Sequence, residues 1–264
     1  MELIDIGCNL AHDSFDADRT EVLERAREAD VVQMVVTGAS EDGSLAAMEL
    51  ARAHPGELFA TCGVHPHHAS DFTVETENLM HQLAIHDEVR AVGETGLDYF
   101  RDISPRNTQK TVFERQLQVG IATGRPLFLH QRDAHDDFIA IIREVRDQIS
   151  RLVVHCFTGS RKDMYECLDL DCHIGITGWI CDERRGTHMQ EYLKDIPADR
   201  LMVETDSPYL KPRDLRPRVK THRNEPRWLP WIANTLAESR GESLEDLARQ
   251  TTLNARLFFD IQGV

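Results

Sequence analysis

The chain has 264 residues, of which 41% are hydrophobic and 28% charged. No apolar stretch is long enough to span a bilayer, and the opening MELIDIGCNLAHD is too acidic for a signal peptide, so we expect a cytoplasmic protein with no membrane segment. The 30 Lys and Arg residues against 45 Asp and Glu residues give a net charge of −15, which argues against general affinity for duplex nucleic acid.

The six cysteines are scattered along the chain and include no C-x-x-C pair. This spacing suggests neither a disulfide framework nor a structural zinc site. We therefore expect free thiols.

Short apolar runs alternate with amphipathic segments, most of which have helical patterns of 10 to 20 residues. The predicted strands are residues 3–7, 32–37, 58–64, 89–93, 126–130, 152–155, 172–177 and 201–204. Strands rich in Val, Leu and Ile that alternate with helices predict a parallel sheet covered on both faces. Eight such units in about 260 residues favour an α/β fold of the (β/α)₈ type, a TIM barrel, over an open doubly wound sheet.

Two further helices are predicted at residues 225–239 and 244–258, with Asn224 as the N-cap of the first. Without a linker, repeat or low-complexity tract, we expect one domain over residues 1–264. No heptad pattern calls for a partner chain, so we expect a monomer.

Polar residues gather after the predicted strands. They are His65 and His67 after the third, Glu94 after the fourth, His130 and Arg132 after the fifth, His155 at the end of the sixth, and Asp206 after the eighth. Each has an ordinary explanation, since a lone His is usually a loop or core residue and Asp206 could form a turn. However, the C-terminal strand ends of a barrel meet on one face, so the set together predicts a single metal centre.

The chemistry expected of such a centre is hydrolysis. Neutral imidazoles and carboxylates hold a divalent ion with open positions, which lowers the pKa of bound water from about 16 toward 7. Asp206 is well placed to accept a proton from that water. Arg132 lies two residues after His130, on the same side of an extended chain, and is a candidate phosphate clamp.

The segments VGETGLDYF, LHQRDAHDDF, VVHCFTGS, GITGWICDERRG and VETDSPYLKPRDL, in this order, closely resemble the TatD family of metal-dependent deoxyribonucleases. The resemblance covers nearly the whole chain. It implies a TIM barrel of the metallo-dependent hydrolase type that acts as a 3′–5′ exonuclease on single-stranded DNA, in repair or degradation, and it leaves RNA open as a substrate. It also implies that Glu94, His130 and His155 bind the metal, that Asp206 is the general base and a further ligand, and that His65 contacts the substrate.

One departure from the family concerns the first strand, where most members carry D-x-H-x-H. Here Gly7 and Asn9 stand in place of the two histidines. We therefore expect one firmly held ion, with any second ion weak or dependent on substrate. Mg²⁺ or Mn²⁺ fits an oxygen-rich, open site, and the histidines would also suit Zn²⁺. Asn9 either contacts a phosphate or serves in a turn.

The segment from 211 to 223 is positively charged, unlike the chain as a whole, because it holds six Lys or Arg residues and one Asp. Together with Arg184 and Arg185 in the preceding loop, it is a candidate rim for holding a single strand. A solvated, Pro-rich loop is the alternative. Tyr99 and Trp179 are the candidates for stacking on a base.

Two other functions stay open at this point. The same barrel and ligands could attack the carbonyl of a small molecule, as an amidohydrolase or esterase does. Alternatively, the loss of the first-strand histidines could mark a barrel that has become a binding protein without turnover. The basic segment favours phosphate over a carbonyl, and the intact set of His, Glu and Asp residues argues against the binding protein.

Overall fold

The computed structural model describes residues 1–263, in which eight parallel strands pair in sequence order from β1 to β8. The strands are β1 Leu3–Cys8, β2 Val31–Val36, β3 Leu58–Cys62, β4 Val89–Asp98, β5 Leu127–Arg132, β6 Leu152–Val154, β7 His173–Ile176 and β8 Leu201–Val203. All eight predicted strands are confirmed to within a few residues, apart from the much longer β4. The predicted TIM barrel is therefore confirmed.

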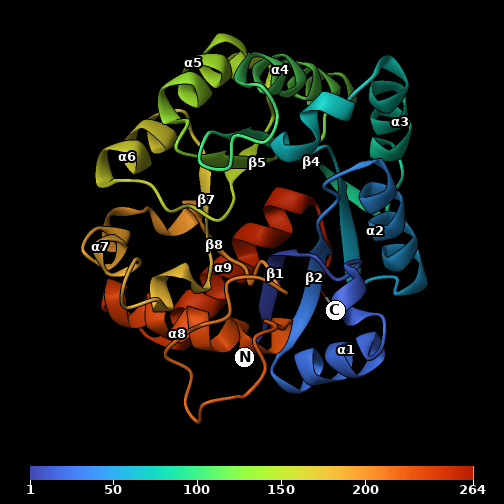
Figure 1. Ribbon diagram of the computed structural model, residues 1–264. Helices are drawn as coiled ribbons and strands as arrows, with labels where there is room; N and C mark the ends of the chain where they lie inside the picture. Colours follow the sequence, from blue (N-terminus) through green and yellow to red (C-terminus); the bar gives the residue numbers. More distant parts are fainter. Residues whose placement is uncertain (264) are drawn as a thin grey trace.

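Helices surround the strands, as Figure 1 shows. They are α1 Arg19–Glu28, α2 Glu41–Ala53, α3 Val74–Ala84, α4 Arg106–Thr123, α5 His135–Val145, α6 Arg161–Asp169, α7 Thr187–Gln190, α8 Leu229–Arg240 and α9 Leu244–Phe259. The segment between β7 and β8 departs from the predicted alternation, because it contains only the short α7 and several 3₁₀ turns. No helix within residues 1–263 is both long and apolar enough to cross a membrane.

The barrel interior is filled by one compact apolar cluster. It consists of Ile4, Ile6, Val35, Phe59, Ala91, Phe128, Val153 and Met202 from the strands, with Ala255, Phe258, Phe259 and Ile261 from α9 and the residues after it. The end of α9 therefore closes the barrel interior with two phenylalanines, and its red ribbon lies inside the ring of helices in Figure 1. Burial of these side chains makes the barrel a packed core and leaves polar chemistry to the loop ends of the strands.

Strand β4 runs five residues past its predicted end because two glycines allow a close approach to β5. Gly93 and Gly96 have φ angles of 141° and 147°, a region that side-chain-bearing residues rarely adopt. A Cβ atom on Gly96 would lie 1.9 Å from the main-chain oxygen of His130. The pairing register also shifts between Val92 and Thr95. Glu94 therefore sits at an irregularity in the strand, a common location for functional residues.

The predicted N-cap role of Asn224 is wrong. Helix α8 begins at Leu229, after a 3₁₀ turn at Pro226–Trp228. The buried Asn224 side chain donates to the Thr205 carbonyl at 2.9 Å and accepts from the Glu225 amide at 3.0 Å. Its amide group is used to tie the long loop after β8 to the end of that strand.

The seam between β1 and β8 is joined by loop and side-chain hydrogen bonds. The Asp206 amide donates to the Gly7 carbonyl at 2.8 Å, and the Asn9 amide donates to the Ser207 carbonyl at 2.7 Å. Beneath them, the fully buried carboxyl group of Asp5 accepts hydrogen bonds from the amide and hydroxyl of Thr205. Burial raises the pKa of Asp5 to about 8, although these hydrogen bonds oppose the shift.

We expect the Asp5→Asn substitution to change how stability depends on pH. Because the folded pKa of about 8 lies above the value near 4 in the unfolded chain, the folded state holds a proton that the unfolded state releases between these values. The free energy of unfolding should therefore fall as pH rises from 5.5 to 7.5, by about 1 kcal/mol per pH unit more in the parent than in the variant. Urea unfolding of both proteins measures this difference, and equal slopes would contradict it.

Candidate metal centre and active-site cavity

The predicted site residues meet at one cavity of about 610 Å³ on the C-terminal face of the barrel. Its lining includes Asn9, His65, His67, Glu94, Asp98, His130, Arg132, His155, Trp179, Asp206 and Tyr209. Side chains from seven different strand ends or the loops that follow them therefore share one space. Arg184 and Arg185 do not line this cavity and lie in an adjoining one, described below.

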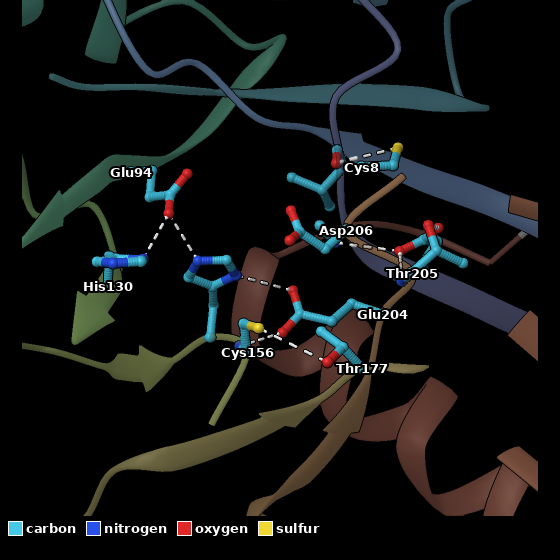
Figure 2. A network of polar contacts seen from close by, with 12 residues as sticks. Cys8, Glu94, His130, Cys156, Thr177, Glu204, Thr205 and Asp206 are labelled. Carbon is cyan, nitrogen blue, oxygen red and sulfur yellow. Dashed lines mark hydrogen bonds and ion pairs between the residues drawn. The ribbon is translucent and has the colours of Figure 1, made fainter. Parts of the chain in front are cut away.

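Several imidazoles surround Glu94, and Figure 2 shows one of its oxygens joined by dashed lines to His130 and to a second imidazole. Its Oε1 atom lies 2.7 Å from His155 Nε2 and 3.0 Å from His130 Nδ1. His65 Nε2 lies 3.5 Å from the same oxygen. Burial alone would raise the pKa of Glu94, but the surrounding imidazoles hold it well below its usual range. The carboxylate is therefore ionised in spite of its burial.

The three imidazoles around Glu94 differ in their second ring nitrogen. His155 Nδ1 lies 3.3 Å from Glu204 Oε2. His65 Nδ1 accepts a hydrogen bond from the main-chain amide of His67 at 3.1 Å. His130 Nε2 is buried, has no hydrogen-bond partner within residues 1–263, and lies 3.6 Å from a carboxylate oxygen of Asp98.

This donor set fits a divalent cation. The ligand atoms of Glu94 and His130 lie within 4.8 Å of one another, and His155 Nε2 lies 2.7 Å from Glu94 Oε1. His65 belongs to the same cluster, but its Nδ1 accepts from the His67 amide, so its Nε2 faces the cavity as a donor. Imidazole nitrogens and carboxylate oxygens are the usual ligands of divalent metals in catalytic sites. The first strand adds no imidazole, because Gly7 and Asn9 stand at its end.

Asp206 faces the same cavity from the end of β8. Its Oδ1 atom accepts a hydrogen bond from Asn9 Nδ2 at 3.1 Å, and its backbone has a positive φ of 53°. Burial raises the pKa of Asp206 to about 7, with His155 opposing the shift and Glu94 adding to it. Asn9 Nδ2 also donates to the Ser207 carbonyl at 3.2 Å, so the amide hydrogens of Asn9 are used within the protein rather than directed at a phosphate.

Glu204 is a site residue that the sequence pattern does not single out, and it is fully buried between β6, β7 and β1. Besides its contact with His155, Glu204 Oε1 accepts a hydrogen bond from the main-chain amide of Cys156. A signal was present, because an ionisable residue stands at the end of an apolar strand, two residues before Asp206. The hydrophobic pattern alone places Glu204 only at the end of a strand.

Cys156 does not form a nucleophilic pair with His155, because its sulfur contacts Thr177. Its sulfur lies 3.6 Å from Thr177 Oγ1, and burial raises the pKa of the thiol to about 12. All six cysteines are free, which confirms the predicted absence of disulfides.

Arg132 is held over aromatic rings at the rim of the cavity. Its guanidinium carbon lies 3.8 Å from the centre of the Phe100 ring and 5.9 Å from that of Trp179. The prediction that Tyr99 stacks on a base is wrong. Its hydroxyl donates to Asp137 at 2.6 Å, its ring lies under Arg106, and it does not line the cavity.

A second cavity of about 470 Å³ adjoins the first and shares Trp179 and Leu210 with it. Its cationic lining residues are Arg184, Arg185, Lys211, Arg213 and Arg218. The buried carboxylate of Asp182 lies 3.0 Å from Arg184 and 2.9 Å from Arg185, and it anchors these arginines in the loop. Positive charge is thus concentrated beside the metal centre of an acidic protein.

Comparisons with known proteins agree with this geometry. The family model described as TatD related DNase matches residues 4–260. A Pantoea ananatis protein named 3′-5′ ssDNA/RNA exonuclease TatD is 46% identical over 98% of this chain and 100% of its own length. A Klebsiella pneumoniae protein of the same name is 45% identical over 99% of this chain and 100% of its own.

Among solved structures, the TatD homolog YJJV from Escherichia coli K12 has a TM-score of 0.89 and is 25% identical, with 98% of each chain covered. The resemblance predicted from the motif segments is confirmed by the match over nearly the full chain. The protein belongs to the TatD-related DNase family of metal-dependent hydrolases.

Proposed function

We propose that this protein removes nucleotides from the 3′ end of single-stranded DNA, and also of RNA, with a divalent metal ion. The observation that carries the proposal is the convergence of His130 and His155 on one oxygen of Glu94, beside a basic cavity. The names of relatives at 46% identity, which specify a 3′-5′ ssDNA/RNA exonuclease, support it. The whole chain would act as one nuclease domain and as a monomer.

In this proposal Glu94, His130 and His155 hold the ion, and Asp206 is a further ligand. Mg²⁺ or Mn²⁺ suits the carboxylates, and Zn²⁺ suits the imidazoles. One ion is held firmly, because the first strand lacks the histidines that would bind a second. When bound, the ion polarises a phosphoryl oxygen and lowers the pKa of water.

The remaining residues position the reacting groups. Asn9 holds Oδ1 of Asp206, which leaves Oδ2 to accept a proton from the attacking water. Burial lowers the pKa of His65 to about 3, so its imidazole is neutral and donates a hydrogen bond through Nε2 to a phosphate oxygen. Arg132, held by Phe100 and Trp179, neutralises charge on the phosphate.

The rest of the strand would enter the adjoining basic cavity. Arg184, Arg185, Arg213 and Arg218 would contact its phosphates, and Trp179, which borders both cavities, would stack on a base. The net charge of −15 over the whole chain disfavours extensive duplex contact, whereas a short single strand needs only this local patch.

An amidohydrolase or esterase acting on a small molecule is the alternative, since the same ligands could serve attack on a carbonyl. Concentrated positive charge beside the centre favours a polyanionic substrate instead. A panel of amide, ester and phosphodiester substrates with Mg²⁺, Mn²⁺ and Zn²⁺ separates the two functions.

We expect Glu94→Gln and Asp206→Asn each to reduce nuclease activity by at least about 100-fold, because one removes a metal ligand and the other the proton acceptor. The assay follows a 5′-labelled single-stranded oligonucleotide in EDTA, Mg²⁺ and Mn²⁺, and the parent should give a ladder that shortens from the 3′ end. Glu245→Gln, at an exposed position on α9, is the control and should stay active. Full activity of Asp206→Asn would overturn its assigned role.

Removing two cations of the basic cavity should affect long substrates selectively. For the Arg213→Ala/Arg218→Ala double variant, we expect the KM for a 12-nucleotide strand to rise about tenfold and its salt dependence to weaken. Hydrolysis of the p-nitrophenyl ester of thymidine 5′-phosphate, which has no further phosphates, should not change.

The matched control for this variant is Arg249→Ala on α9, where the side chain is 75% exposed and pairs with Asp246. An equal loss on both substrates would show that the two arginines support the fold rather than the strand.

A further inference from the structure

The hydrogen bonds behind each imidazole decide what that ring presents to the cavity. A neutral imidazole has one nitrogen that donates and one that accepts, and a metal binds only the nitrogen with the free lone pair. Whatever contacts the distant nitrogen therefore sets the role of the near one. His65 and His155 both direct Nε2 at Glu94, but their Nδ1 atoms meet groups of opposite kind.

His65 Nδ1 meets a donor, the main-chain amide of His67 at 3.1 Å. This nitrogen must accept, so the hydrogen of a neutral His65 lies on Nε2. His65 therefore presents an N–H group to the cavity, which suits a phosphate oxygen and not a metal ion.

His155 Nδ1 meets an acceptor, Glu204 Oε2 at 3.3 Å. His155 Nε2 also faces an acceptor, Glu94 Oε1 at 2.7 Å, so both ring nitrogens meet carboxylate oxygens. When an ion takes the lone pair of Nε2, the one remaining ring hydrogen lies on Nδ1, and Glu204 Oε2 is placed to accept it. The other oxygen of Glu204 is fixed by the Cys156 amide, which prevents the carboxylate from turning away.

Two glycines make the space for this carboxylate. A Cβ atom on Gly175 would lie 2.6 Å from Glu204 Oε1, and one on Gly7 would lie 2.2 Å from Oε2, so neither position accepts a side chain without displacing Glu204. Gly7 lies near the end of β1. Glu204 occupies the volume next to it, is fully buried, and contacts no Lys or Arg within the described residues.

We propose that Glu204 is a positioning residue that holds His155 in the tautomer able to bind the metal, while the His67 amide holds His65 in the opposite tautomer as a hydrogen-bond donor. The inference rests on the proposed function only in taking His155 as a metal ligand. It adds a role for a residue that touches neither substrate nor metal.

The sharpest test is Glu204→Gln, which preserves side-chain volume. The Cys156 amide claims the glutamine oxygen, so the NH₂ group faces His155 Nδ1 and favours the wrong tautomer. A carboxylate-to-amide change behind a catalytic histidine is known to act in this way in serine proteases. We expect Zn²⁺ affinity, measured by competition with a chelating dye, to fall about 10- to 100-fold.

The tautomer itself is read by ¹⁵N NMR of the Zn²⁺-loaded protein. The parent should show a hydrogen on Nδ1 of His155 and a metal-bound Nε2, and Glu204→Gln should lose this signature. Glu204→Asp keeps a group that only accepts, so it should weaken Zn²⁺ binding but retain the Nδ1 hydrogen. This difference separates control of the tautomer from a general packing defect, and it also serves if Glu204→Gln does not fold.

Glu225→Gln is the control for removing a buried carboxylate. Glu225 is 3% exposed, pairs with Arg25 at 2.9 Å and does not line the cavity. We expect this variant to lose stability and keep its Zn²⁺ affinity. Parent-like affinity and an Nδ1 hydrogen in Glu204→Gln would overturn the inference. A parent protein that binds Zn²⁺ through His155 and cleaves no nucleic acid would overturn the proposed function and leave the inference standing.

Discussion

The buried carboxylate of Glu94 is the constraint on which the rest of the site depends. An ionised carboxylate this deep in the barrel is stable only with several polar partners around it, because the desolvation penalty for an unpaired ion is several kcal/mol. His65, His130 and His155 supply those partners from three other strand ends. The glycines of the GETG segment make this arrangement possible, since they let β4 pass close to β5 and carry Glu94 into the cavity.

The positive charge beside the cavity, like the site itself, belongs to the loops and not to the packed barrel interior. Asp182 is buried in the segment between β7 and β8. Its carboxylate pairs with Arg184 and Arg185 and holds these arginines in place beside the candidate metal centre. The acidic remainder of the protein repels polyanions elsewhere, so attraction is confined to one face. This arrangement suits a substrate that must present one end to the cavity.

The sequence allowed the strand order, the barrel and most of the cluster to be predicted, because hydrophobic periodicity and strand-end placement are local signals that the fold preserves. The predictions are wrong or incomplete at residues whose hydrogen bonds depend on contacts with distant parts of the chain. The sequence predicts that Asn224 caps a helix, but its side-chain amide donates to the Thr205 carbonyl instead. Tyr99 turns away because Asp137, on a later helix, accepts its hydroxyl. The sequence pattern indicates only that Glu204 ends a strand. Its carboxylate becomes part of the site through contacts with β1 and β6, which are distant in sequence.

The glycine at position 7 has a structural role besides adding no metal ligand. Glu204 and a side chain at position 7 compete for one volume, because a Cβ atom on Gly7 would already meet the carboxylate at 2.2 Å. A histidine at this position would therefore displace Glu204, whose Oε2 atom lies 3.3 Å from His155 Nδ1. In this chain the small residue at position 7 and the placement of the Glu204 carboxylate depend on each other.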